Sequence, residues 1–165
     1  MKFEKVSYEQ FKKDLLEVSK ELDEEDIEEI YENIELPTRS TEKSAGYDFK
    51  IPYAMMLFAN NDENIIFPTG IKCQLDDNKV LLLMPRSSLG LKHGFMLPNT
   101  IGVIDADYYN NPDNEGHIKW SYKVNHHITL DQGDKYMQGV IVSYYTTDDD
   151  STTGVRTGGI GSTGA

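Results

Sequence analysis

The chain has 165 residues, which suits a single domain, and a formal net charge of −12. This charge argues against a general nucleic-acid binder, because a protein that neutralises phosphates needs a basic footprint. The only cysteine, Cys73, excludes a disulfide framework and a zinc–cysteine cluster. The sequence has neither an apolar leader nor a run of membrane-spanning length, so we expect a cytoplasmic protein without membrane contact.

Residues 1–35 are predicted to form a helical extension. Ser7 followed by Gln10 is a capping-box pattern, and apolar residues at helical spacing come after it. They are Tyr8, Phe11, Leu15, Val18 and Leu22. A second, acidic helix is expected from Asp23 to Asn33. Its apolar side consists of Ile27, Ile30, Tyr31 and Ile34.

The glutamates of the second helix allow two interpretations. Glu24, Glu25, Glu28 and Glu29 could hold a metal ion or a partner. A solvated face is favoured, because these acids complement the positive helix N-terminus and lack a matching set of ligands. For both helices, packing against the domain and docking of a protein partner stay open as functions.

Short apolar runs separated by turn residues predict an all-β domain over residues 36–145. The runs are Phe49 to Tyr53, Ile65 to Phe67, Gly70 to Leu75, Val80 to Met84, Ile118 to Val124 and Tyr136 to Tyr145. Two long links interrupt them, Ala54 to Glu63 and Tyr109 to Glu115, and the second is expected to be a hairpin extension. Residues 146–165 are polar and then glycine-rich, which predicts a C-terminal arm that is mobile when empty.

The stretch from Asn99 to Tyr108 carries the first candidate for catalysis. A short β-branched run leads into Asp-x-Asp-Tyr, so a strand is expected to end with carboxylates at its tip. Asp105 follows the apolar Ile104, and a carboxylate with a fixed direction can serve as a general base. An aspartate at a strand end is also a common turn former, so these residues alone leave both interpretations open.

The four histidines do not have the spacing of a metal site. His126 and His127 are adjacent, so on a strand they would point to opposite faces. His93 and His117 have no carboxylate or cysteine at ligand spacing. We expect all four to be surface or core residues.

The pattern Asn-x-x-Gly-Val-Ile-Asp-x-Asp-Tyr from Asn99 to Tyr108 resembles the third of five motifs of the trimeric deoxyuridine triphosphatases (dUTPases). The other four occur in order at Ala45 to Asp48, Pro85 to Gly90, Gly133 to Gln138 and Arg156 to Gly164. The resemblance implies a dUTPase-like β-clip, or jelly-roll-like, fold. It also implies magnesium-dependent hydrolysis of dUTP to dUMP and diphosphate, which limits uracil incorporation into DNA and supplies dUMP for dTTP synthesis.

The resemblance also implies roles for the catalytic groups. Asp105 would activate the attacking water, Ser87 would bind the bridge between the α and β phosphates, and Gln138 would reach the α phosphate. Arg86 and Ser88 would contact phosphate. Asp48 would hold a water of a magnesium ion that is bound mainly by the triphosphate.

The remaining implied roles concern the nucleoside and the arm. Around the third motif, Asn99, Gly102 and Ile104 would present groups to uracil, and Tyr108 would lie against deoxyribose and exclude a 2′-hydroxyl. Arg156 would contact the γ phosphate, and Ile160, Gly161, Ser162 and Thr163 would close over the substrate. The arm differs from the family pattern at two positions. Ile160 replaces the phenylalanine that commonly stacks on the base, and Arg156 is one residue closer to the Gly158-Gly159 pair than in many relatives.

The family resemblance implies a homotrimer with shared active sites, in a bacterial host cell if the chain is phage-encoded. Two alternatives remain. A dCTP deaminase has a similar Arg-Ser-Ser-Leu segment, but the strand from Ile118 to Tyr122 lacks the glutamate base that it needs. Phage members of the family can bind repressors, which makes the N-terminal helices and the Tyr109–Glu115 insertion candidate surfaces of a nucleotide-gated regulatory protein.

Overall fold

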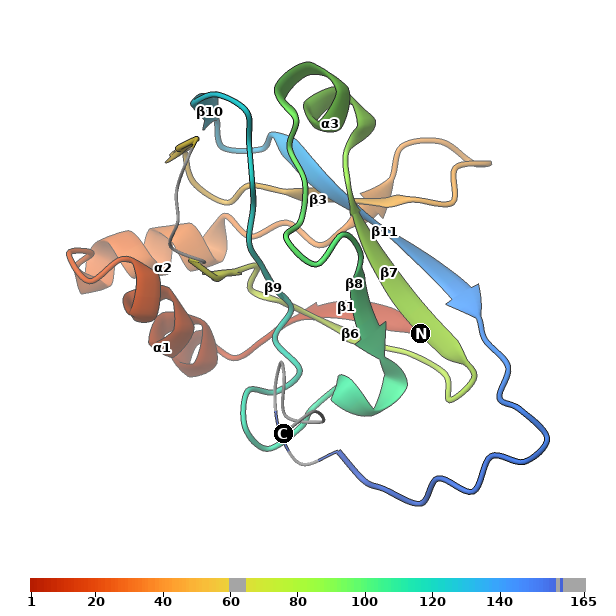
Figure 1. Ribbon diagram of the computed structural model, residues 1–165. Coiled ribbons are helices and arrows are strands. Elements are labelled where there is room, and N and C mark those ends of the chain that lie inside the picture. Colours follow the sequence, from red (N-terminus) through yellow and green to blue (C-terminus); the bar gives the residue numbers. More distant parts are fainter. Residues whose placement is uncertain (60–64, 157, 159–165) are drawn as a thin grey trace.

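The computed structural model describes residues 1–59, 65–156 and 158 (Figure 1). Its strands are β1 (Lys2–Lys5), β2 (Thr38–Arg39), β3 (Tyr47–Lys50), β4 (Met55–Leu57), β5 (Phe67–Pro68), β6 (Ile71–Gln74), β7 (Lys79–Pro85), β8 (Gly102–Asp105), β9 (Lys119–Trp120), β10 (Ile128–Leu130) and β11 (Lys135–Ser143). Its helices are α1 (Tyr8–Val18), α2 (Glu24–Glu32), α3 (Ser87–His93) and a 3-10 turn, Ala106–Tyr108. The predominance of strands confirms the predicted all-β domain with added N-terminal helices.

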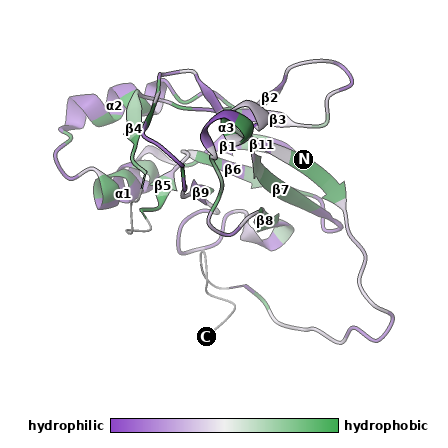
Figure 2. Ribbon diagram, turned by 45° about the horizontal axis from the view of Figure 1, so that its top comes forward, coloured by the Kyte–Doolittle hydropathy of each residue, from purple (hydrophilic) through white to green (hydrophobic). Residues whose placement is uncertain are grey.

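A five-stranded antiparallel sheet in the order β2-β3-β11-β7-β8 forms the centre of the molecule. The long strands β7 and β11 lie side by side in Figure 1, and Figure 2 shows that both are rich in hydrophobic residues. Leu81, Leu83 and Met137 alternate toward the interior and are almost fully buried. This sheet therefore gives the site a stiff base, with β8 as one edge.

The N-terminal segment is more than a helical extension, because it begins with a strand. β1 pairs with β6 in an antiparallel ladder, which the sequence prediction missed. The predicted cap is present, because Ser7 accepts a hydrogen bond from the Gln10 amide, and Asp23 caps α2 in the same way through the Asp26 amide. Phe11, Leu15 and Ile27, which belong to the helices, are buried in the same core as the β domain. Packing against the domain is thus what these helices do.

Several predicted strand boundaries are corrected by the structure. The supposed link Ala54–Glu63 contains β4, which pairs with β10. The predicted strand Ile118–Val124 is ladder-paired only over β9, and Lys123 forms an isolated bridge with Met96. The Pro-Arg-Ser segment opens helix α3, which apolar periodicity did not indicate because none of its residues is buried. In the described part of the chain, no helix is long and apolar enough to cross a membrane.

The segment Tyr109–Glu115 is a compact loop and not the hairpin extension expected from its composition. Asn111 and Asn114 turn inward, where they are 5% and 7% exposed. The Asn111 side chain accepts hydrogen bonds from the amides of Asp113 and Asn114, and donates to the Tyr108 carbonyl. The asparagine side chains thus add to the backbone hydrogen bonds inside the loop, because Asx side chains can mimic a turn.

Candidate active site

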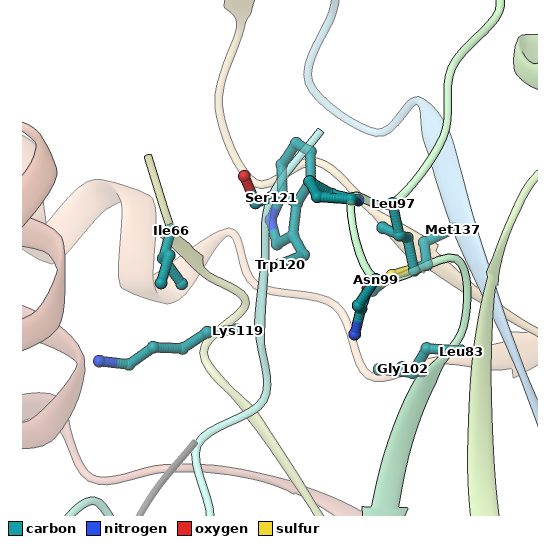
Figure 3. A pocket seen from close by; sticks show the side chains of 10 residues that line it. Ile66, Leu83, Leu97, Asn99, Gly102, Lys119, Trp120, Ser121 and Met137 are labelled. Atoms are coloured by element: carbon teal, nitrogen blue, oxygen red, sulfur yellow. The ribbon is translucent and has the colours of Figure 1, made fainter. Parts of the chain in front are cut away.

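A pocket between β7, β8 and β9 contains two of the three predicted base-binding residues, Asn99 and Gly102, whereas Ile104 does not line it. Its volume is about 250 Å³, near the lower end for small-molecule sites. It is lined by Ile66, Leu83, Leu97, Pro98, Asn99, Gly102, Lys119, Trp120, Ser121 and Met137. Figure 3 shows Asn99 and Gly102 on one side, with the Lys119 side chain extending away toward the helices. Apolar walls with one amide suit a flat heterocycle that needs a few directed hydrogen bonds.

Asp105 ends β8, so it lies at the strand tip as predicted, and Ile104 beside it is 8% exposed. Its carboxylate Oδ2 accepts a hydrogen bond from Arg156 Nη2 at 2.6 Å. Asp107, two residues on, accepts from Arg156 Nε at 2.9 Å. In Figure 1 the chain leaves β11, runs through an extended segment and returns to this turn, which is how Arg156 reaches residues about 50 positions earlier.

Tyr108 is a core residue, 3% exposed. Its hydroxyl donates to the His117 carbonyl at 2.9 Å and accepts from Asn114 Nδ2 at 2.8 Å. Burial raises the pKa of this phenol, which therefore stays protonated. The guanidinium of Arg156 lies 5.6 Å from the ring centroid. Burial and these two hydrogen bonds thus hold Tyr108 in one position next to the turn that follows Asp105.

Asp48 lies on β3, 2% exposed, among three donors. Arg86 Nη1 is 2.5 Å from Oδ1, and Lys135 Nζ and Ser40 Oγ are 2.9 and 2.7 Å from Oδ2. Burial alone would raise the pKa of this carboxyl, but the hydrogen bonds from Lys135 and Ser40 and the charge of Arg86 outweigh it and lower the pKa. Asp48 is therefore a charged group that organises Arg86.

The other phosphate-binding candidates surround this ion-pair cluster. Ser87 and Ser88 are exposed in the first turn of α3, directly after Arg86. Gln138 on β11 is opposite Asp48 in the ladder and donates weakly to the Pro85 carbonyl at 3.5 Å. A Cβ on Gly46 would come within 2.7 Å of Gln138 Oε1, so only glycine at position 46 allows the Gln138 amide to keep its observed position. Hydroxyls, an amide and a guanidinium thus share one end of the sheet.

The predicted site residues fall into two groups at opposite ends of β7. Asp105 pairs with Val80 at the start of the strand, whereas Arg86 and Ser87 follow its last residue, Pro85. The strand from Val80 to Pro85 spans about 17 Å, at about 3.4 Å per residue. Within one chain, the proposed base therefore cannot reach a phosphate that is bound at Ser87.

Two contacts at the site lacked a sequence-based assignment. Lys135 had no predicted role, yet it binds Asp48. Asp107 binds Arg156, and its spacing two residues after Asp105 was the available signal. The predicted contacts Ile160, Gly161, Ser162 and Thr163 lie outside the described residues.

The donor set fits a magnesium ion held mainly by phosphates. Among the described residues, no three His, Cys, Asp or Glu side chains are placed to hold a metal ion. Magnesium commonly uses one or two carboxylates together with substrate phosphates and retained waters. Asp48 is paired with two cations, which makes it a poor direct ligand, but a carboxylate can still accept a hydrogen bond from a metal-bound water.

Fold and site together define a β-sheet protein with a cluster of phosphate-binding candidates at one end of the sheet and a separate small pocket, and comparisons identify the family. The dUTPase family model matches residues 32–164. The chain is 42% identical over 136 residues to the deoxyuridine 5′-triphosphate nucleotidohydrolase of Lactococcus lactis, covering 80% of this chain and 89% of that protein. It is 34% identical to the Hahella chejuensis enzyme, covering 79% and 88%. The chain belongs to the dUTPase family.

Solved structures agree with this assignment. The dUTPase of Streptococcus mutans superposes with a TM-score of 0.64 at 34% identity, covering 90% of this chain and 99% of that one. A mutant dUTPase of phage phi11 of S. aureus, whose structure shows the coordination of a structural Mg(II) ion, gives a TM-score of 0.60 at 22% identity. That match covers 73% of this chain and 91% of that one, and it shows the shared fold. The family match and the named homologues together indicate dUTP diphosphatase activity for this chain.

Proposed function

We propose that this chain hydrolyses dUTP in active sites shared among the subunits of a homotrimer. The separation of Asp105 from Ser87 along β7 carries the proposal, because both groups must be near one triphosphate for catalysis. A neighbouring copy would bring its Asp105 end to the Ser87 end of the first. Closed rings of identical subunits satisfy this requirement at every site at once.

In this site, Asn99 and the backbone around Gly102 bind the base, and Tyr108 lies against the sugar. Arg86, Ser87, Ser88 and Gln138 of the other subunit bind phosphate oxygens and stabilise the charge that develops on the leaving group. Asp105 orients a water and accepts its proton for in-line attack on the α phosphorus. A bound magnesium ion would neutralise triphosphate charge, and Asp48 would hold one of its waters.

A mixing experiment tests the shared site. Asp105→Asn and Ser87→Ala are each purified as inactive proteins, then unfolded and refolded together at equal amounts. If the two residues come from different subunits, about a quarter of the sites regain both native groups and activity returns. Each variant refolded alone is the control. If no activity returns in the mixture although mixed oligomers form, the two residues act within one subunit and the shared site is wrong.

A substrate panel tests the nucleotide assignment. Diphosphate release is measured from dUTP, dCTP, dTTP and UTP, with and without magnesium. Preference for dUTP with magnesium supports the assignment, and deamination of dCTP would support the rival enzyme.

The cytoplasmic location and the domain boundaries at residues 35 and 145 stay predictions from the sequence. The regulatory alternative stays a prediction as well.

A further inference from the structure

The N-terminal segment, residues 1–31, precedes the part of the chain that the family model matches, yet it binds the loop beside the site. The backbone amide and hydroxyl of Ser7 donate to the Glu115 carboxylate at 3.0 and 2.5 Å. The Tyr109 hydroxyl donates to Glu4 on β1. Lys72 on β6 adds an ion pair to Glu115 at 3.2 Å. The loop that follows Tyr108 is therefore bound to the N-terminal segment at both of its ends, Tyr109 and Glu115.

A buried acid–base pair continues this connection. Asp14 of α1 is 3% exposed and His117 is fully buried, with Oδ2 and Nδ1 separated by 2.5 Å. The Gly70 amide donates to His117 Nε2 at 2.7 Å, which assigns the ring proton to Nδ1 and makes Asp14 its acceptor. Lys119 donates to Asp14 Oδ1 at 2.8 Å. Both ring nitrogens are thus engaged, and the imidazole has one fixed orientation.

The backbone of His117 connects this pair to Tyr108. The Tyr108 hydroxyl donates to the His117 carbonyl and accepts from Asn114, so the position of residue 117 sets the position of the phenol oxygen. Gly116 has φ +78°, and a Cβ there would lie 2.5 Å from the Tyr108 carbonyl oxygen. The backbone around Gly116 therefore packs directly against the backbone of Tyr108, which leaves the segment from Tyr108 to His117 little room to shift.

We propose that α1 is a positioning element for Tyr108, with Asp14 and His117 as positioning residues for the selection of deoxyribose over ribose. The inference rests on the proposed role of Tyr108 as the sugar contact. Excluding a single hydroxyl requires a ring placed to within a fraction of an ångström, because a small shift opens room for the extra oxygen. Asp14 and His117 are 103 positions apart in sequence, so folding of the N-terminal segment is what supplies this constraint.

The test compares variants of the Asp14 contact with a matched control in the same segment. Asp14→Asn removes the buried charge, and Ser7→Ala removes an exposed hydroxyl that binds Glu115. We expect each to lower the ratio of kcat/KM for dUTP to that for UTP, by about tenfold for Asp14→Asn. The control, Asp23→Ala, removes the cap of α2 and weakens the same segment without a described contact to residues 109–117. It should leave the ratio unchanged.

The variant Tyr108→Ala distinguishes two possible errors: a wrong positioning role for α1, and a wrong role for Tyr108 as the sugar contact. If Tyr108→Ala shifts the ratio while Asp14→Asn and Ser7→Ala do not, the sugar contact stands and the positioning role of α1 is wrong. If Tyr108→Ala also leaves the ratio unchanged, both are wrong. If Asp14→Asn fails to fold, the ratio measured for Ser7→Ala tests the inference, because Ser7 is exposed and its substitution should be tolerated. Faster hydrogen exchange across residues 109–117 in the Asp14 and Ser7 variants, but not in the control, is the expected second readout.

Discussion

Arg156 donates a hydrogen bond at 2.6 Å to Asp105, so the proposed base is ion-paired with the arm of its own chain. A second bond from the same guanidinium reaches Asp107. While this pair persists, the guanidinium occupies a carboxylate oxygen that the proposed base needs for orienting a water. We expect a triphosphate to compete for Arg156, because guanidinium binds phosphate as well as carboxylate, and thereby to free Asp105.

Arg156→Gln should therefore weaken triphosphate binding more than monophosphate binding. We expect the dissociation constant of a non-hydrolysable dUTP analogue to rise about tenfold, or roughly 1.4 kcal/mol, with that of dUMP unchanged. Calorimetric titration measures both. Arg39→Gln is the control, since Arg39 contacts only nearby carbonyls among the described residues. If Arg156→Gln weakened binding of the dUTP analogue and of dUMP equally, a role of Arg156 specific to the outer phosphates would be contradicted.

Asp105→Asn should preserve the fold and nucleotide binding while removing the chemical step. The amide keeps the shape of the side chain but cannot accept the proton of water. We expect kcat to fall by about 10²- to 10⁴-fold, the usual contribution of a general base. Diphosphate release and titration with the dUTP analogue are the measurements. Near-normal turnover of the variant would show that Asp105 is not the general base.

Gly46→Ala should displace Gln138 without unfolding the protein. The added Cβ would lie 2.7 Å from Gln138 Oε1, and the flexible amide is the group that moves. We expect kcat to fall by on the order of tenfold or more, because the amide leaves its place near the phosphate site. In Gly90→Ala the nearest atom, the Phe95 carbonyl oxygen, is 3.6 Å away, so this matched change should keep activity. Activity equal to that of the wild type in Gly46→Ala would place Gln138 outside catalysis.

Asp48→Asn should lower stability and weaken the response to magnesium. Arg86 and Lys135 lose their common anion, which we expect to cost about 2 kcal/mol of unfolding free energy, the scale of a hydrogen bond to a charged group. The magnesium concentration at half-maximal activity should rise, because the amide holds a metal-bound water less strongly. Denaturant titration and activity against magnesium measure the two effects. An unchanged magnesium response would leave Asp48 with a purely structural role.

His117 should make the protein less stable as the solution is acidified below pH 6.5. Burial lowers the pKa of His117 despite the opposing hydrogen bond and charge of Asp14, with Lys119 lowering it further and Glu115 raising it. The unfolded chain then binds a proton that the folded chain does not, so unfolding becomes easier as pH falls from about 6.5 toward the folded pKa. The slope can reach about 1.4 kcal/mol per pH unit. Denaturant unfolding from pH 8 to 5 measures it.

The control for this pH dependence is another histidine. His117→Gln should remove the slope, at a cost in overall stability from the lost contact with Asp14. His126→Asn, at an exposed position, should retain it. If His117→Gln keeps the full slope, the acid sensitivity comes from other groups.

The family and the order of its motifs could be predicted from the sequence, because short motifs encode local chemistry. The strand that ends at Asp105 and the cap at Ser7 depend on neighbours within a few residues, so periodicity and capping rules predicted them. Strand boundaries were less accurate, since a two-residue ladder such as β9 depends on its partner strand.

Long-range contacts decided the rest. The distance between Asp105 and Ser87 follows from the register of β7 with β8, and register is a property of paired strands. The burial of Asp14 against His117 joins residues more than a hundred positions apart, and neither residue stands in a recognisable motif. The sequence by itself thus determined which chemical groups the protein carries. The tertiary structure alone decided which of them meet, because contacts between distant residues form only when the whole core packs.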